Sequence, residues 1–182
     1  MLKLKQILVL CLLAIGLGLS SCSSISGGGL KSYADVQDGY EFLYPNGWVS
    51  VETAAGPDVV FRDLIETSEN VSVVINPVPE GKTLVELGSP SEVGYRLSKA
   101  AIAPPGSNRQ AELVNAEAYE RGPQTYYLLE YAVTLPNQKR HNLTSMAVSR
   151  GKLYSFSAST TEARWQQMAE TFDQVAHSFS VY

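Results

Sequence analysis

The stretch that decides the fold runs from Thr125 to Ser159: Thr-Tyr-Tyr-Leu-Leu-Glu-Tyr-Ala-Val-Thr-Leu-Pro-Asn-Gln-Lys-Arg-His-Asn-Leu-Thr-Ser-Met-Ala-Val-Ser-Arg-Gly-Lys-Leu-Tyr-Ser-Phe-Ser-Ala-Ser. Residues 125–135 are rich in Tyr, Leu and Val, a composition typical of a β-strand, and a loop at 136–139 follows them. Residues 141–149 and 153–159 predict a hairpin that turns at Arg150-Gly151.

Shorter strands are predicted on the N-terminal side of this stretch. The runs are β-branched or aromatic and cover residues 40–44, 48–51, 59–61 and 71–75, and a longer strand is expected at 112–121. Pro45-Asn-Gly47 and Gly122-Pro123 are turn signals between them. Most of the chain is therefore predicted to be strand.

Two helices interrupt the strands. Ser89-Pro-Ser-Glu92 matches a capping box with proline at the first helical position and predicts a helix over about residues 90–101. Ser159-Thr-Thr-Glu162 reads as a second capping box, followed by one apolar stripe at helical spacing: Trp165, Met168, Phe172, Val175, Ala176 and Phe179. The pattern predicts an α+β fold in which helices cover an antiparallel sheet.

The first 22 residues indicate export. Lys3 and Lys5 precede an uncharged run, Ile7 to Leu19, and Leu19-Ser-Ser-Cys22 matches a bacterial lipobox. The run is shorter than the roughly 20 apolar residues of a spanning helix, so it reads as a signal peptide. We predict a signal peptide at 1–21, a lipidated linker at 22–30 with acylated Cys22, and one domain at 31–182. An ordinary secretory cut or an uncleaved signal anchor is the alternative.

Composition narrows the function classes. The chain has 14 basic and 18 acidic side chains, and removal of Lys3 and Lys5 leaves 12 against 18, a balance of −6. Such a surface gives no electrostatic reason to bind nucleic acid. The chain has two cysteines, Cys11 in the signal and Cys22 at the lipidation site, so the domain has no disulfide or thiolate metal site.

Several motifs, in order along the chain, resemble the PsbP family, the extrinsic subunits of photosystem II, in its cyanobacterial lipoprotein branch. They are Gly39-Tyr-Glu-Phe-Leu-Tyr-Pro-Asn-Gly-Trp48, Phe61-Arg-Asp63, Asn70 to Pro77, Leu87 to Gly94, Tyr127-Leu-Leu-Glu-Tyr131, Arg140-His-Asn142, Lys152-Leu-Tyr154, and Arg164-Trp165 through Ser178-Phe179. The resemblance covers residues 33–182. It implies an antiparallel β-sheet sandwiched between helices.

The resemblance also implies a non-enzymatic accessory role at photosystem II, on the lumenal side of the thylakoid membrane. Plant members help to retain calcium and chloride through a segment that precedes the domain. Here a Ser/Gly linker stands in that place, so assembly, repair or stabilisation of the oxygen-evolving side is the expected role, without a required cofactor. The expected partners are lumenal subunits of photosystem II, and the chain is expected to be a monomer.

Arg140 and His141 are the candidate docking residues, because the resemblance points to a contact at this position. We expect a surface imidazole at His141 that pairs with a carboxylate. A strand-edge histidine with one local hydrogen bond is the plainer interpretation.

Glu170, Asp173 and His177 are candidate metal ligands. Their spacing places them on one polar edge of the last helix, where a carboxylate and an imidazole one turn apart can chelate Zn or Mn. This pattern supports an alternative function, a metal-carrying lipoprotein. The plainer interpretation is a solvated helix face with a histidine favoured by the helix dipole.

Other candidates are weaker. Trp48, Tyr126, Tyr127 and Tyr131 could form an aromatic binding surface, but core packing is the expected role for such rings. No Gly-x-Ser-x-Gly or phosphate loop is present, and Asp63, Glu66 and Glu69 are expected to be solvated loop charges. We therefore predict no enzyme. A small hydrolase or ligand-binding protein outside photosynthesis would require a deep pocket with converging polar groups.

Overall fold

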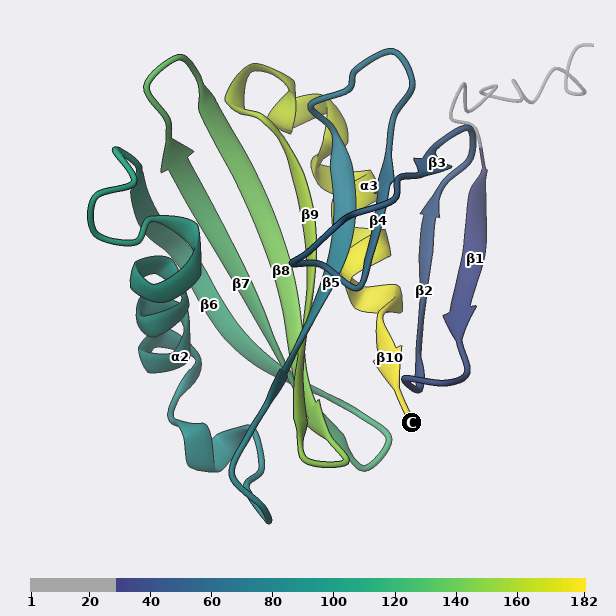
Figure 1. Cartoon of the computed structure of the whole chain (residues 1–182), viewed down its shortest axis with the longest axis vertical. Helices are drawn as coiled ribbons and strands as arrows, with labels where there is room; N and C mark the ends of the chain where they lie inside the picture. The colour runs from purple at the N-terminus through teal and green to yellow at the C-terminus, as the bar shows by residue number, and fades with distance from the viewer. Residues whose placement is uncertain (1–28) are drawn as a thin grey trace, which may run out of the picture.

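A seven-stranded antiparallel sheet is the centre of the computed structural model, which describes residues 29–182 (Figure 1). In spatial order its strands are β3 (Val49–Ser50), β4 (Val59–Arg62), β5 (Asn70–Pro77), β9 (Lys152–Thr161), β8 (Lys139–Ser149), β7 (Gln124–Thr134) and β6 (Gln110–Arg121). The strands from β6 to β9 are consecutive hairpins, so the predicted hairpin at residues 141–159 is confirmed.

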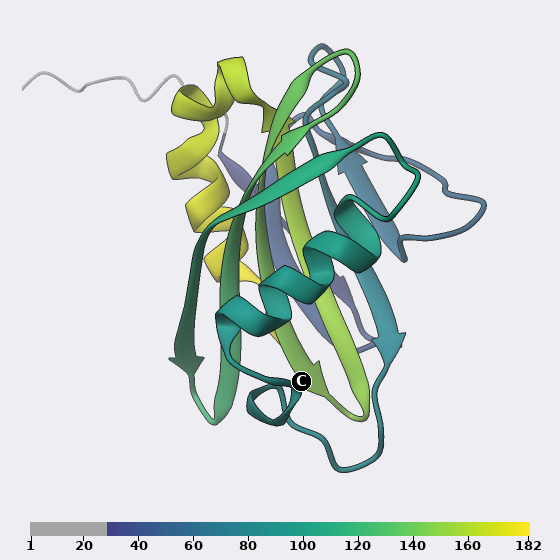
Figure 2. The same cartoon turned by 90° about the vertical axis from the view of Figure 1, so that its left-hand side faces the viewer.

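Two further layers cover this sheet. Helix α2 (Pro90–Leu97) lies on one face, and helix α3 (Trp165–Ser178) lies on the other, beside a small sheet (Figures 1 and 2). The small sheet has the order β1 (Leu30–Asp35), β2 (Tyr40–Pro45) and β10 (Ser180–Val181). The predicted α+β fold with a sandwiched antiparallel sheet is confirmed. No helix among residues 29–182 is long and apolar enough to cross a membrane.

Strand β7 shows why its sequence is apolar at nearly every position. Side chains alternate between the two faces of a strand. Tyr126 and Leu128 therefore pack into the core under α3, while Tyr127 and Leu129 pack into the core under α2. A strand that is buried on both faces needs apolar residues at consecutive positions.

The two cores differ in composition. The core under α3 is aromatic and includes Tyr40, Phe42, Phe61, Tyr154, Phe156, Phe172 and Phe179. The core under α2 is smaller and mainly aliphatic, with Leu84, Val93, Val133 and Met146 around Tyr131. Trp48 and the three tyrosines at positions 126, 127 and 131 are all buried, so the core interpretation of these rings is confirmed.

The first capping box forms and the second does not. Ser89 Oγ accepts a hydrogen bond from the Glu92 backbone, and the Glu92 side chain accepts one from the Ser89 backbone. Helix α2 ends at Leu97, and one π-helical turn, η2 (Ser98–Ile102), completes the predicted helical segment. A short 3-10 turn, η1 (Val85–Leu87), precedes α2.

The capping box predicted at Ser159 is wrong. Ser159 is still part of β9, where it pairs with Asn142 of β8. The chain then forms a 3-10 turn, η3 (Glu162–Arg164), and α3 begins at Trp165. Pairing with β8 extends to Thr161 and takes the backbone that a cap at Ser159 would need.

Both outer edges of the large sheet carry irregular or short strands. At one edge β3 has two residues. At the other, β6 is long, but its register with β7 shifts between Leu113 and Asn115, which marks a β-bulge. Val114 at this bulge is exposed.

Candidate functional site

Arg140, one of the two predicted docking residues, lies in β8 and reaches across β9 to a loop. Its Nη2 donates to the Ser68 carbonyl at 2.6 Å and to Ser159 Oγ at 2.6 Å. Burial lowers the pKa of the Arg140 guanidinium, and the charge of Glu69 opposes that shift. Arg140 therefore fixes the loop that joins β4 to β5 rather than presenting its charge freely to solvent.

Glu69 is the centre of a buried charge network at the end of the same loop. The residue is 2% exposed, and its Oε1 accepts hydrogen bonds from Thr160 Oγ1 at 2.9 Å and from Arg164 Nε. The hydrogen bond to Glu69 raises the pKa of Arg164. The prediction that Glu69 is a solvated loop charge is wrong, because the Arg164 guanidinium and the Thr160 hydroxyl replace water around it.

The loop held by this network displays two apolar side chains. Asp63 Oδ1 accepts hydrogen bonds from the backbone of Ile65 and of Glu66, each at 2.7 Å, and the Asp63 backbone donates to the Glu69 carbonyl at 3.1 Å. Leu64 is 64% exposed and Ile65 is 88% exposed. The loop is thus closed by several hydrogen bonds, while its apolar tip, defined as Leu64 and Ile65, is largely exposed.

His141, the second predicted docking residue, is not on the surface. It is 5% exposed and lies between two carboxylates, with Nε2 2.7 Å from Glu130 Oε1 and Nδ1 3.0 Å from Glu162 Oε2. Its ring stacks on Trp165, with centroids 3.9 Å apart. The expectation of a surface imidazole is wrong, because β8 is an inner strand and α3 begins directly above it.

The two contacts of His141 link separate elements. Glu130 belongs to β7, and Glu162 belongs to η3, the turn that leads into α3. His141 therefore ties β7 to the segment that begins α3.

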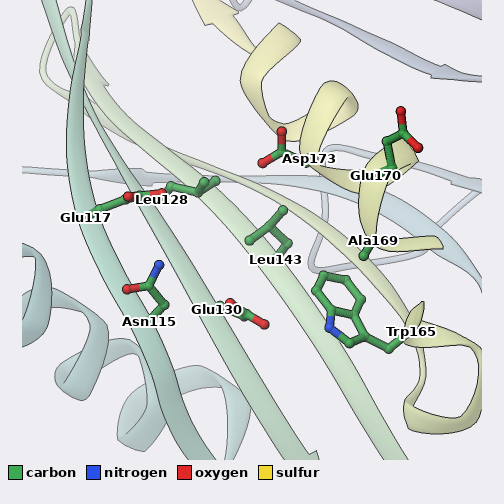
Figure 3. A pocket seen from close by; sticks show the side chains of 9 residues that line it. All are labelled: Asn115, Glu117, Leu128, Glu130, Leu143, Trp165, Ala169, Glu170 and Asp173. Atoms are coloured by element: carbon green, nitrogen blue, oxygen red, sulfur yellow. The ribbon is translucent and has the colours of Figure 1, made fainter. Parts of the chain in front are cut away.

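A groove of about 380 Å³ lies beside this network, between α3 and the outer strands of the large sheet (Figure 3). Its apolar wall consists of Leu128, Leu143, Trp165 and Ala169, and its polar wall of Asn115, Glu117, Glu130, Glu170 and Asp173. Asn115 directly follows the β6 bulge. The groove combines apolar surface with four carboxylates.

The predicted metal ligands are only partly brought together. His177 Nδ1 lies 3.2 Å from Asp173 Oδ1, and the His177 ring packs against Tyr119. Glu170 and Asp173 line the groove, and His177 is not among the groove residues. In Figure 3, Asp173 points toward the groove and Glu170 points away from it.

Within residues 29–182, a different trio has ligand atoms within 4.8 Å of one another: Asp35, Asp38 and Asp58. All three carboxylates already have partners in the fold. Asp35 Oδ1 accepts a hydrogen bond from the Asp38 backbone at 2.8 Å. Lys152 Nζ donates to Asp38 at 2.7 Å, and the Tyr40 hydroxyl donates to Asp58. These hydrogen bonds within the fold account for the close approach of the three aspartates without a metal ion.

Sequence reasoning missed most of this network. Glu69, Glu130 and the pair Glu162 and Arg164 come from three separate segments, and only pairing of β5, β7, β8 and β9 brings them together. One local signal was present in Asp63-Leu-Ile-Glu66, where two large apolar residues stand next to each other in an acidic loop.

Comparison with known proteins identifies the family to which this architecture belongs. The PsbP family model matches residues 28–181. The chain belongs to the PsbP family.

The relatives are cyanobacterial as well as plant proteins. The chain is 53% identical to CyanoP of Thermosynechococcus vestitus, over 90% of this chain and 91% of that protein. It is 47% identical to CyanoP of Synechocystis sp., over 99% of this chain and 98% of that protein. The solution structure of Synechocystis CyanoP, a cyanobacterial PsbP, matches with a TM-score of 0.74 and 49% identity, over 90% of this chain and 99% of that structure.

Proposed function

We propose that this chain is a lipid-anchored accessory protein of photosystem II on the lumenal side of the thylakoid membrane. It docks to lumenal subunits and assists the assembly, repair or stability of the oxygen-evolving side. It does so without catalysis and as a monomer. Acylated Cys22 supplies the anchor, and the domain supplies the docking surface.

Family membership over the whole domain is the observation that carries this proposal. The family model and the CyanoP relatives both extend across nearly all of residues 29–182, the range that contains Arg140 and His141. Function still requires a site, because one fold can serve several functions.

We propose that Arg140 and His141 have an indirect part in docking. Both side chains are used inside the molecule, where they fix the loop at 63–69 and the start of α3. They are positioning residues for the exposed groups around them. A lipid anchor confines the search for a partner to the membrane, so that a modest interface can suffice.

Co-purification tests the proposal. The chain is tagged after Tyr182, expressed in its host, and recovered from gently solubilised thylakoids. Enrichment of photosystem II subunits is expected, and the assembly intermediates that dominate will separate an assembly factor from a permanent subunit. Absence of photosystem II subunits even after mild cross-linking would overturn docking. The matched control is the same tag on an unrelated lumenal lipoprotein.

A Zn or Mn carrier is the second candidate, and the contact between Asp173 and His177 favours it. Two protein ligands one helical turn apart leave an incomplete site, so Glu170 would have to turn toward them. Equilibrium dialysis of the chain with Zn or Mn tests this. Micromolar uptake that His177→Ala abolishes would support the carrier, and uptake unchanged by His177→Ala would exclude this site.

A further inference from the structure

The apolar tip, Leu64 and Ile65, is displayed rather than packed. Single exposed apolar residues are ordinary on protein surfaces. Here two neighbouring ones protrude from a loop that is closed by Asp63 and fixed to the sheet by Arg140. A partly buried guanidinium and a buried carboxylate, Glu69, are thus used to hold a loop whose outermost side chains are apolar.

The tip lies at the end of the domain where the chain enters it. The Gly29 carbonyl, in the first described residue, accepts a hydrogen bond from Asn46 at 2.9 Å, in the turn that leads to β3. Val49 of β3 then pairs with Arg62, which immediately precedes the loop. Figures 1 and 2 show the start of β1 and the β4–β5 loop at the same end of the molecule.

We propose that Leu64 and Ile65 insert into the lipid bilayer and orient the domain on it. The inference rests on the proposed lipid anchor. Residues 23–28 separate Cys22 from Gly29, and an extended residue spans at most about 3.6 Å, so the entry point lies within roughly 25 Å of the anchored residue. This end of the domain can therefore touch the membrane that holds the anchor.

The charges near the tip fit a bilayer contact driven by apolar insertion. The Asp63 carboxylate accepts two backbone hydrogen bonds, and Glu69 is bound to Arg164 and Thr160. Glu66 lies 4.0 Å from Arg164. These three carboxylates have partners within the protein. We therefore expect the contact to depend on the apolar side chains and to form on neutral lipid. Each inserted Leu or Ile side chain favours the membrane by about tenfold or more.

A single label measures the insertion. The expected mature chain carries one cysteine, Cys22, which is acylated, so Ile65→Cys creates a unique free thiol. The full lipidated chain with an environment-sensitive dye at this thiol is reconstituted into phosphatidylcholine vesicles. Brominated acyl chains should quench the dye at least twofold.

Val36→Cys is the matched control. Val36 is 81% exposed, and it follows β1 at the end of the β1–β2 hairpin opposite Gly29. Its dye should stay in water and remain unquenched. Equal quenching at the two positions, or none at Ile65→Cys, overturns the proposal. A chain that does not float with the vesicles overturns both the tip and the anchor.

A second variant separates the membrane from a protein partner. Leu64→Ser together with Ile65→Ser should speed transfer of the lipidated chain between vesicles about tenfold or more, whereas Val36→Ser should leave the rate unchanged. Vesicles contain no photosystem II, so this result is independent of co-purification. If the dye at Ile65→Cys is shielded only in thylakoids that contain photosystem II, the tip contacts protein and the bilayer proposal fails.

Discussion

Two charged clusters of this protein, both with a carboxylate near a histidine or an arginine, sit in opposite environments. In the first cluster Glu69 and His141 are buried, and each of these two side chains has several partners. Along the outer edge of α3, Asp173 and His177 form one contact in solvent. The first cluster joins three strands, a loop and a helix, whereas the second joins two positions on one helix.

The contrast shows that the contribution of a charged side chain to the free energy of unfolding depends on which groups replace its hydrating water. A buried charge that loses its partner is left without solvation and destabilises the fold strongly. An exposed pair that loses one member is simply hydrated, so little changes. The predictions below test this contrast in order of decreasing effect.

The largest effect is expected for Glu69→Gln. The variant leaves the Arg164 guanidinium without its buried counter-charge, and breaking such a pair typically costs about 3–5 kcal/mol of unfolding free energy. Urea denaturation of the variant and the parent chain measures the difference. The control is Glu66→Gln, 4.0 Å from Arg164 and half exposed, for which a change below about 0.5 kcal/mol is expected. Similar small losses in both variants would contradict the comparison.

A smaller loss is expected for His141→Leu. The replacement preserves apolar bulk against Trp165 but leaves Glu130 without its 2.7 Å partner. An unsatisfied, largely buried acceptor costs about 1–3 kcal/mol. Glu162→Gln is the control, because its carboxylate is nearly half exposed and water can replace the contact. Thermal unfolding followed by circular dichroism checks both, and equal midpoints would show that His141 adds no stability.

The capping box of α2 sharpens the comparison, because it is exposed yet has fixed backbone partners. Ser89→Ala should cost about 1 kcal/mol, the usual value of a lost N-cap. Urea denaturation measures it, with Ser91→Ala inside the same helix as the control. A loss no larger than that of Ser91→Ala would show that the cap is not used.

Glu92 adds a pH dependence to this box. The hydrogen bond from the Ser89 backbone, joined by one from its side chain, lowers the pKa of Glu92. A carboxyl whose folded pKa is depressed stabilises the fold above its ordinary range, and this contribution disappears as the pH falls through the folded pKa. The stability difference between the parent and Glu92→Ala should therefore be constant from pH 6 to 8 and shrink below about pH 4. A difference that grows in acid would contradict the sign.

The smallest effect is expected for His177→Ala. Its contact with Asp173 is exposed, so the unfolding free energy should change by no more than about 0.5 kcal/mol. The same urea measurement applies. A loss above 1 kcal/mol would show that packing of the ring on Tyr119 has more weight than its exposure implies.

Much of the fold could be predicted because it depends on local patterns. The apolar run of β7, the turn at Arg150-Gly151 and the capping box at Ser89 each carry their own signal in consecutive residues. The second capping box failed because strand pairing, a long-range effect, extended β9 through Ser159. The residues Ser159-Thr-Thr-Glu162 are compatible both with a helix cap and with a continued strand.

The candidate site was predicted less well for the same reason. Arg140 and His141 were identified through the resemblance, but the predicted exposure of His141 was wrong, since burial depends on which strand lies inside the sheet. Glu130 becomes the partner of His141, and Ser159 the partner of Arg140, only after β7 and β9 assemble around β8. No spacing along the chain encodes such a pairing.

The bulged strand β6 has a consequence for encounters between copies of this chain. An open strand edge is a template on which a second copy can add its own strand. Along β6 the glutamates at positions 112, 117 and 120 and the kink at the bulge oppose such addition, and β3 at the far edge offers only two residues. Both edges of the large sheet therefore oppose the addition of strands from other copies, and with it the growth of the sheet into fibres.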